Sequence, residues 1–312
     1  MSTDATRDPD RVLLGLCAFA LTWAAVVFQA GGFTTSIGAG MAFLDWPLSN
    51  GSVNPPGWLT NLDMFAEHSH RLAAAKFGLI LVGLAAAHAL RERRREVRLL
   101  AFALVGLVVA QGGLGGLRVL LDQLNTGADH NRGGVGFGIA HALMAQLTVA
   151  SLAALTLTHT RAWRRADASV PARVRSLAAA APVALLLVMV AAAVMRQNRV
   201  TLWTTDGQGL FLPAVGEGWV WWVNALHRAG ALVASVAVVG LVVACWRAGI
   251  ARRLAGVAAA ALALQVTLGI LALGLPQNPH PRTIHVLVGA VLFSSTCCLA
   301  LLCRRARPTE AR

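Results

Sequence analysis

The sequence predicts an all-α polytopic membrane protein with eight transmembrane helices. Of its 312 residues, 56% are hydrophobic and only 13% are charged, and the mean hydropathy is +0.62. That much apolar surface exceeds what the core of one soluble domain can bury. Eight apolar stretches approach the roughly 20 residues that a helix needs to cross a bilayer. Because eight is an even number, both termini are expected on the same side of the membrane.

The first apolar stretch is expected to be an uncleaved helix rather than a signal peptide. The residues before it mix acidic and basic side chains, and no small-residue cleavage site follows it. The predicted spans, in order, are residues 12–30, 71–90, 99–120, 136–158, 177–195, 220–246, 254–274 and 284–303.

The formal net charge of +13 alternates between the connections rather than forming one basic surface. Arginines concentrate in residues 91–98, 161–175, 247–253 and 304–307, whereas residues 31–69 contain no lysine or arginine. By the positive-inside rule, the basic connections and both termini are cytoplasmic, and the protein is a multi-pass protein of the cell (plasma) membrane. The charge is thus a topology signal, and we expect no nucleic acid partner.

Four histidines begin alternate predicted helices. His70, His141, His227 and His285 open the second, fourth, sixth and eighth spans, respectively. Since these four helices run in the same direction, all four imidazoles lie at one depth, near the extracytoplasmic side.

An internal repeat divides the histidines into two pairs. His70-Arg71 in the second span matches His227-Arg228 in the sixth. The motif Gln-x-x-Leu-Gly occurs in the third span from Gln111 and in the seventh from Gln265. The repeat predicts two pseudo-symmetric four-helix bundles, related by an axis along the membrane normal. We expect an N-terminal half (1–160), a cytoplasmic linker (161–176) and a C-terminal half (177–312).

Within each bundle the two histidines can face one another: His70 with His141, and His227 with His285. Ionisable residues inside a bilayer are costly and usually functional. Imidazole is a common axial ligand of haem iron, so we expect these four residues to be haem ligands. For any single histidine the alternative is a hydrogen bond to a neighbouring helix.

Three charged residues next to these histidines are candidates for roles at the site. Arg71 and Arg228 can pair with a haem propionate or extend to the lipid headgroups. Glu67 shares a helix face with His70 if the helix extends back one turn. It can orient the ligand, handle protons, or simply stabilise the start of the helix.

The other histidines and the cysteines are expected to have no catalytic role. His88 and His159 lie at the inner ends of spans, and His130 and His280 lie in outer connections, so we expect all four to be interfacial or solvated. We assign no role to Lys76. No disulfide or zinc site is expected from the cysteines, which are Cys17, Cys245, Cys297, Cys298 and Cys303.

Taken in order along the chain, these motifs resemble those of the haem A synthase family of cytochrome oxidase assembly. The matching residues are Gly31-Gly32-x-Thr34, Gly38, Gly40, Asp45-Trp46-Pro47-Leu48, Glu67-His-Ser-His70-Arg71, Gln111-x-x-Leu114-Gly115-Gly116, His141, His227-Arg228, Gln265-x-x-Leu268-Gly269 and His285. Many bacterial members carry a cysteine pair around Asp-Trp-Pro-Leu. Here Phe43 and Ser49 stand in those places, so a redox role for that pair is not open to this chain.

The resemblance implies that haem O is the substrate and that its C8 methyl is oxidised to a formyl group by two hydroxylations and loss of water, which gives haem A. It implies that haem b is the cofactor, held by His227 and His285 with Arg228 nearby. His70 and His141, with Arg71, then bind haem O, and Glu67 is the catalytic residue.

The implied partners are the lipid bilayer, a haem O synthase and an unidentified electron acceptor. One alternative is a two-haem membrane cytochrome b that transfers electrons without modifying haem. Such cytochromes commonly use histidine pairs about 13 or 14 residues apart on one helix, which places haems across the bilayer. Here each histidine has its own helix and all lie on one side. The other alternative is a haem-binding chaperone.

Overall fold

The computed structural model describes residues 10–127, 132–164, 170–198 and 218–305, and their regular structure is helical. Eight helices in these ranges are long and apolar enough to cross a membrane, which confirms the predicted class. They are α1 (Arg11–Ile37), α2 (Leu62–Arg91), α3 (Arg95–Leu120), α5 (Arg132–Thr158), α7 (Ala172–Gln197), α9 (Trp219–Arg247), α10 (Arg252–Gly274) and α11 (Pro279–Arg305). Two short helices, α4 (Gln123–Thr126) and α6 (Arg161–Arg164), lie in connections.

The helices that carry the four histidines begin earlier than their apolar stretches. Helix α2 begins at Leu62, where the side chain of Asn61 accepts hydrogen bonds from the backbone N–H groups of Asp63 and Met64. Each histidine therefore lies roughly two turns inside its helix, and the expectation that it opens the helix is wrong. Hydropathy marks the apolar part of a helix, whereas capping side chains mark its start. Since α2 extends past Glu67, Glu67 and His70 are on one helix.

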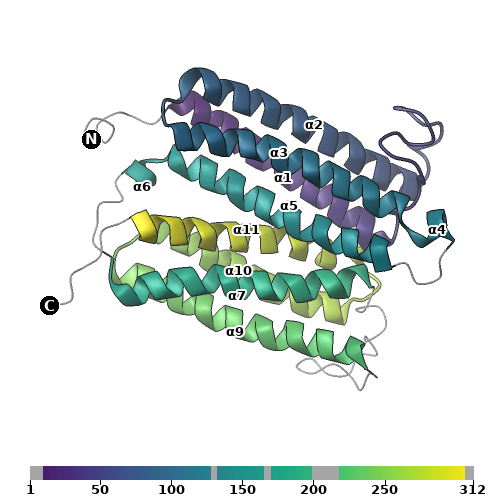
Figure 1. The fold of residues 1–312 in the computed structure, drawn as a ribbon. Coiled ribbons are helices and arrows are strands. Elements are labelled where there is room, and N and C mark those ends of the chain that lie inside the picture. Colours follow the sequence, from purple (N-terminus) through teal and green to yellow (C-terminus); the bar gives the residue numbers. More distant parts are fainter. Residues whose placement is uncertain (1–9, 128–131, 165–169, 199–217, 306–312) are drawn as a thin grey trace.

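Helix contacts divide the helices into two groups (Figure 1). Helices α1, α2, α3 and α5 contact one another, as do α7, α9, α10 and α11. Helix α11 also packs against α1 and α5, and its span is 67% buried, compared with 17% for α3. Helix α7 begins at Ala172, inside the residues expected to form the linker. The central position of α11 places one histidine-bearing helix of the second group directly against the first group.

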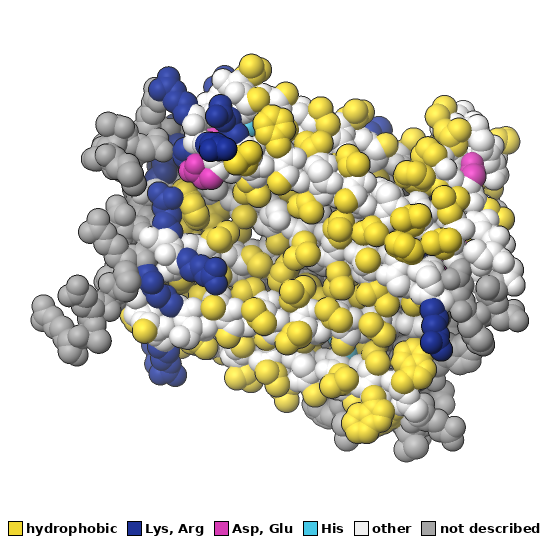
Figure 2. All heavy atoms as spheres, in the orientation of Figure 1, with side chains coloured by type: hydrophobic (Ala, Val, Ile, Leu, Met, Phe, Trp, Pro, Cys, Tyr) yellow, Lys and Arg dark blue, Asp and Glu magenta, His cyan; other side chains and the backbone are white. Residues whose placement is uncertain are grey.

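Charge separates one end of the bundle from the rest. Figure 2 shows Lys and Arg side chains gathered at the end where α1 begins and α11 ends, and mainly apolar side chains along the helices. That distribution fits a multi-pass membrane protein. At the other end, α1 stops at Gly38, whose φ of 81° lies in the left-handed region that glycine adopts at low cost. The turn leads into the connection between α1 and α2, called here the outer loop (residues 38–61).

Candidate functional site

The fold brings the four histidines together in two pairs. His70 on α2 and His141 on α5 are close enough for their ring charges to interact. His285 on α11 has the same relation to His227 on α9. All four side chains are partly buried. Each pair thus joins two helices of one group near the end that carries the outer loop.

The glutamine of the repeated motif contacts a histidine in both groups of helices. Nε2 of Gln111 donates a hydrogen bond to the backbone oxygen of His141 at 2.8 Å and lies 3.1 Å from its Nδ1. Nε2 of Gln265 lies 3.0 Å from Nε2 of His285. The repeat therefore encodes the same helix-to-helix contact twice.

Three glycines allow the imidazoles to lie against helix backbone. A Cβ atom on Gly115 would lie 3.1 Å from Cε1 of His141, and one on Gly269 would lie 3.4 Å from Cε1 of His285. A Cβ on Gly31 would lie 2.6 Å from Cε1 of His70, closer than real Cβ contacts. At Gly115 the missing side chain lets α3 approach the helix that carries His141.

Two ring nitrogens of these pairs have no hydrogen-bond partner within the described residues. They are Nδ1 of His70 and Nδ1 of His285, and both are buried. Buried polar atoms are nearly always partnered, so an unpaired imidazole nitrogen suggests that a further group belongs there. Imidazole is a common axial ligand of haem iron, so these side chains fit haem when each ring directs a nitrogen lone pair at the iron.

Glu67 and Arg71 attach the outer loop to α2. Oε1 of Glu67 lies 2.5 Å from Nη2 of Arg71, and its Oε2 accepts a hydrogen bond from the backbone N–H of Phe43 at 3.1 Å. Arg71 also donates to the backbone oxygens of Phe43 at 3.2 Å, Asp45 at 2.7 Å and Leu48. Glu67 is only 3% exposed. The guanidinium of Arg71 is thus turned toward the loop.

The Asp-Trp-Pro-Leu stretch folds the outer loop over α3. The carboxylate of Asp45 accepts hydrogen bonds from the backbone N–H groups of Asn50 and Gly51, both at 2.8 Å. Burial alone would raise the pKa of Asp45, but these hydrogen bonds outweigh burial and lower it. The ring of Trp46 lies so close to Gly116 that a Cβ there would be 2.5 Å away. Two motifs of the family resemblance therefore touch.

Phe43 and Ser49, at the places of the family's cysteine pair, both contact His68. Nδ1 of His68 lies 3.0 Å from Oγ of Ser49, and the Phe43 and His68 rings are 6.0 Å apart. Both positions are buried. His68 thus points into the loop, away from the face that carries His70, as its position on the helix predicts.

One ionisable group distinguishes the two histidine pairs. Nε of Arg228 donates a hydrogen bond to Oδ1 of Asn224, one turn earlier, at 2.8 Å. Glu67 and Arg71 have the same spacing on α2, so the position of Glu67 in one half is occupied by Asn224 in the other. A carboxyl group therefore lies beside the pair of His70 and a neutral amide beside the pair of His227.

Three arginines near the histidines were missed in the sequence. Nη2 of Arg196 donates to the backbone oxygen of Gly32 at 2.6 Å and to Oγ of Ser36 at 3.0 Å, and Arg282 donates to the backbone oxygen of Ser36 at 3.2 Å. The charges of Arg282 and Arg118 interact with that of Arg196. The available signal was arginine within or next to the ends of apolar stretches, at the end otherwise poor in arginine.

The expectation for the remaining histidines is wrong at two positions. His88 of α2 and His159, which directly follows α5, are both 0% exposed and hydrogen-bond to each other at the basic end. His280 is exposed as expected and stacks on Phe33 with ring centroids 5.9 Å apart. His130 lies outside the described residues.

Lys76 and the five cysteines are the remaining side chains considered in the sequence. Nζ of Lys76, which the sequence left without a role, lies 5.9 Å from the centre of the Trp23 ring, in a cation–π contact. All five cysteines carry free thiols.

Comparison with known proteins identifies the family. The profile of the family described as "Cytochrome oxidase assembly protein" matches residues 59–297. A protein named "Heme A synthase" from Caulobacter sp. (strain K31) is 39% identical over 103 residues, which cover 29% of this chain and 30% of the relative. The matched segment thus spans less than a third of the relative's length, whereas the family profile spans most of this chain. The chain belongs to this family of cytochrome oxidase assembly proteins, the haem A synthase family.

Proposed function

We propose that the protein is a haem A synthase that oxidises the C8 methyl of haem O to a formyl group. The family supports an activity in haem A biosynthesis. The observation that carries the proposal is the difference between two otherwise matched sites. Both have a histidine pair with glutamine and glycine contacts, but only the pair of His70 has a carboxyl group, Glu67, beside it.

The difference between the halves supports different roles for the two histidine pairs. We assign the haem b cofactor to His227 and His285, with Arg228 nearby, because an electron-carrying site needs no acid. When bound there, haem b supplies one-electron transfer at its iron. We assign haem O to His70 and His141, where the carboxyl group of Glu67 is available. Arg71 serves this substrate site by holding the outer loop and Glu67.

Glu67 has the contacts of a proton-handling group with a fixed position. Conversion of a methyl to a formyl group removes hydrogen, adds oxygen and releases water from the geminal diol. A carboxyl group one turn from His70 can accept or return the protons involved. The hydrogen bonds from Phe43 and Arg71 hold its two oxygens in place. Because the loop covers it, Glu67 can exchange protons with the substrate rather than with bulk water.

Arg118, Arg196 and Arg282 are suited to bind the propionate groups of a haem molecule. Haem propionates are carboxylates, and guanidinium groups bind carboxylates through charge-assisted hydrogen bonds. The charge of Arg118 acts on both His70 and His141, and that of Arg196 acts on His285. We assign these arginines the role of neutralising propionates at both sites.

Pigment extraction tests the function directly. Cells that express this protein together with a haem O synthase are expected to yield haem A, and cells with the synthase alone to yield haem O. Accumulation of haem O alone in the presence of the folded protein contradicts the proposal. It would favour the electron-transferring cytochrome b or the haem chaperone, both of which leave haem chemically unchanged.

A further inference from the structure

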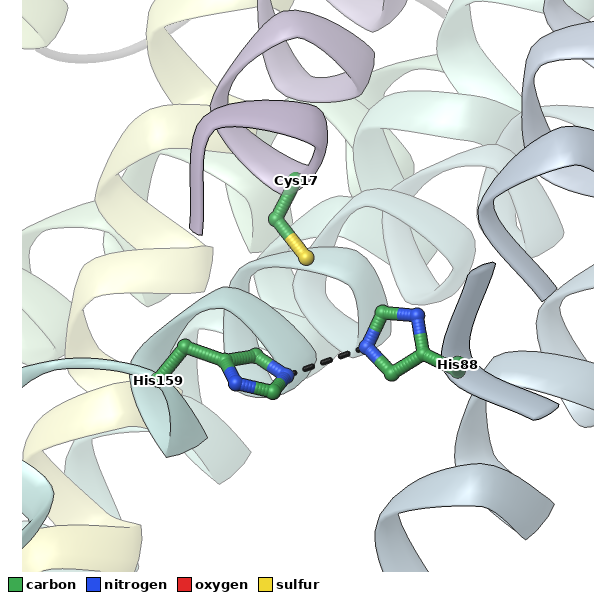
Figure 3. Close-up of side chains that lie close together, drawn as sticks. All are labelled: Cys17, His88 and His159. Atoms are coloured by element: carbon green, nitrogen blue, oxygen red, sulfur yellow. Dashed lines mark hydrogen bonds between the residues drawn. The ribbon is translucent and has the colours of Figure 1, made fainter. Parts of the chain in front are cut away.

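A second cluster of ligand-type side chains lies at the opposite, basic end of the bundle (Figure 3). Cys17 of α1, His88 of α2 and His159, which directly follows α5, point toward one another. All three are 0% exposed. Their sulfur and ring nitrogen atoms lie within 4.8 Å of one another. The proposed haem function uses none of these three residues.

The hydrogen bond of His88 to its own helix fixes where its proton sits. Nδ1 of His88 lies 2.8 Å from the backbone oxygen of Leu84. A carbonyl oxygen only accepts hydrogen bonds, so Nδ1 carries the hydrogen and donates it. In the neutral ring Nε2 then holds a lone pair. That lone pair is directed at His159, whose Nε2 is 3.0 Å away.

His159 can carry its hydrogen on either ring nitrogen, and each position satisfies a different neighbour. Its Nδ1 lies 3.8 Å from Oε2 of Glu92, whose carboxylate is held by Arg94 at 2.8 Å. With the hydrogen on Nε2, His159 would bond to His88 but turn the Nδ1 lone pair toward the carboxylate. That nitrogen is buried and has no hydrogen-bond partner within the described residues. With the hydrogen on Nδ1, the contact with Glu92 is favourable, but the hydrogen bond to His88 is given up.

In the absence of a metal, Nε2 of His159 carries the hydrogen and donates it to Nε2 of His88 at 3.0 Å. Transfer of that hydrogen to Nδ1 of His159, which faces Glu92, leaves a lone pair on both Nε2 atoms for a metal ion to bind. The third group in this corner is the buried thiol of Cys17. Two imidazole nitrogens and one sulfur directed at one point form a ligand set for a metal ion.

We propose that Cys17, His88 and His159 bind monovalent copper. Thiolate and imidazole are donors that suit Cu(I), and three donors suffice for it, whereas structural zinc sites generally use four ligands. A thiolate and Cu(I) sum to zero charge, while a divalent ion would leave a net positive charge in an apolar interior. Binding exchanges a proton for the metal: the thiol S–H bond breaks, an S–Cu bond forms and H⁺ leaves to solvent.

The geometry needs only a small adjustment to hold the metal. With metal–nitrogen distances of about 2.0 Å, nitrogens in a planar three-coordinate site lie roughly 3.5 Å apart. The two Nε2 atoms therefore separate by about half an ångström on binding. Leu84 accepts the Nδ1 hydrogen of His88, and the charge of Glu92, 3.8 Å from Nδ1 of His159, favours a hydrogen there once the metal binds.

A Cu(I) titration of the purified full-length protein tests the site. Under anaerobic conditions, the protein competes for Cu(I) with a coloured Cu(I) chelator, and the absorbance of the chelator complex gives the affinity of the protein. The expected results are one bound equivalent in the unaltered protein and an affinity about 100-fold lower in Cys17→Ser, with Cys298→Ser, another buried span cysteine, unchanged. Glu92→Gln should weaken binding about 10-fold. Equal affinity in Cys17→Ser and the unaltered protein overturns the proposal.

X-ray absorption of the unaltered, copper-loaded protein tests the ligand set without any variant. One sulfur and two imidazole nitrogens around Cu(I) is the expected result. Two sulfur ligands would instead place copper at the buried thiols of Cys245 and Cys303 and overturn the proposal. Retention of zinc with exclusion of copper also overturns it.

Discussion

The side-chain amide of Gln265 lies 3.0 Å from Nε2 of His285. The matched Gln111 contacts His141 in the other group of helices. Each glutamine is on the helix that precedes its histidine in that group, so the contact both joins the two helices and orients the imidazole. Groups that orient an iron-binding imidazole affect haem affinity without touching iron. Haem retention should therefore depend on these amides.

Replacement of Gln265 by leucine keeps the side-chain size but removes the amide. We expect Gln265→Leu to retain about 10-fold less haem b after purification, because the His285 ring loses its orientation. The haem-to-protein ratio, determined from the pyridine haemochrome, measures this. Gln123→Leu, in the exposed helix α4, serves as the control. Full haem content in Gln265→Leu would show that the amide does not orient a haem ligand.

Gly31 gives a test that is specific to the substrate site. In Gly31→Ala, the new Cβ would lie 2.6 Å from Cε1 of His70, so the ring must move. We expect conversion of haem O to fall at least about 10-fold while the b-type spectrum persists, since misplacement by about 1 Å is costly. Gly112→Ala, where a Cβ meets nothing within 4 Å, is the matched control. Equal conversion by the two variants contradicts a role for His70 in binding the substrate.

Glu67→Gln keeps the shape of the side chain but removes the carboxylate. If Glu67 handles protons, conversion of haem O falls about 100-fold or more, and the content of haem b is unchanged. Asp63→Asn, an exposed neighbour on the same helix, should convert normally. If Glu67 only holds the outer loop, Glu67→Gln should convert haem O normally as long as the loop stays folded. Protease resistance measures whether it does. Normal conversion in Glu67→Gln would exclude the proton-handling role.

The outer loop should weaken in acid because of Asp45. Its pKa is lowered in the folded protein from the ordinary 3.8, so ionised Asp45 stabilises the fold above that pH. That contribution is lost as the pH falls below 3.8 through the lower folded value. The melting temperature of the unaltered protein should therefore exceed that of Asp45→Asn at pH 6, and the difference should shrink toward pH 3. A difference that grows on acidification contradicts this account of the loop.

The helices and the histidine pairs could be predicted because they depend on local pattern. Hydropathy gives the spans, and the repeat places His70 opposite His141 without knowledge of packing. The start of α2 was misjudged because the helix continues past its apolar part to Asn61. A capping side chain in a polar segment leaves hydropathy unchanged, so that boundary was not visible.

The contacts that could not be predicted join residues far apart in the chain. The hydrogen bond between His88 and His159 depends on how the four helices of the first group place the end of α2 relative to the end of α5. Each histidine by itself was indistinguishable from a solvated one at a helix end. The same holds for Arg196 and Ser36, which connect helices of different groups. The motif Asp-Trp-Pro-Leu was recognisable, but the contact of Trp46 with Gly116 was not.

The central claim is that the two histidine pairs are separate haem sites with different roles. The absorption spectra of the purified His227→Ala and His70→Ala variants test it most directly. The account predicts that His227→Ala loses the b-type haem bands, whereas His70→Ala keeps them and fails to convert haem O. Loss of the bands in His70→Ala with full retention in His227→Ala would contradict the assignment.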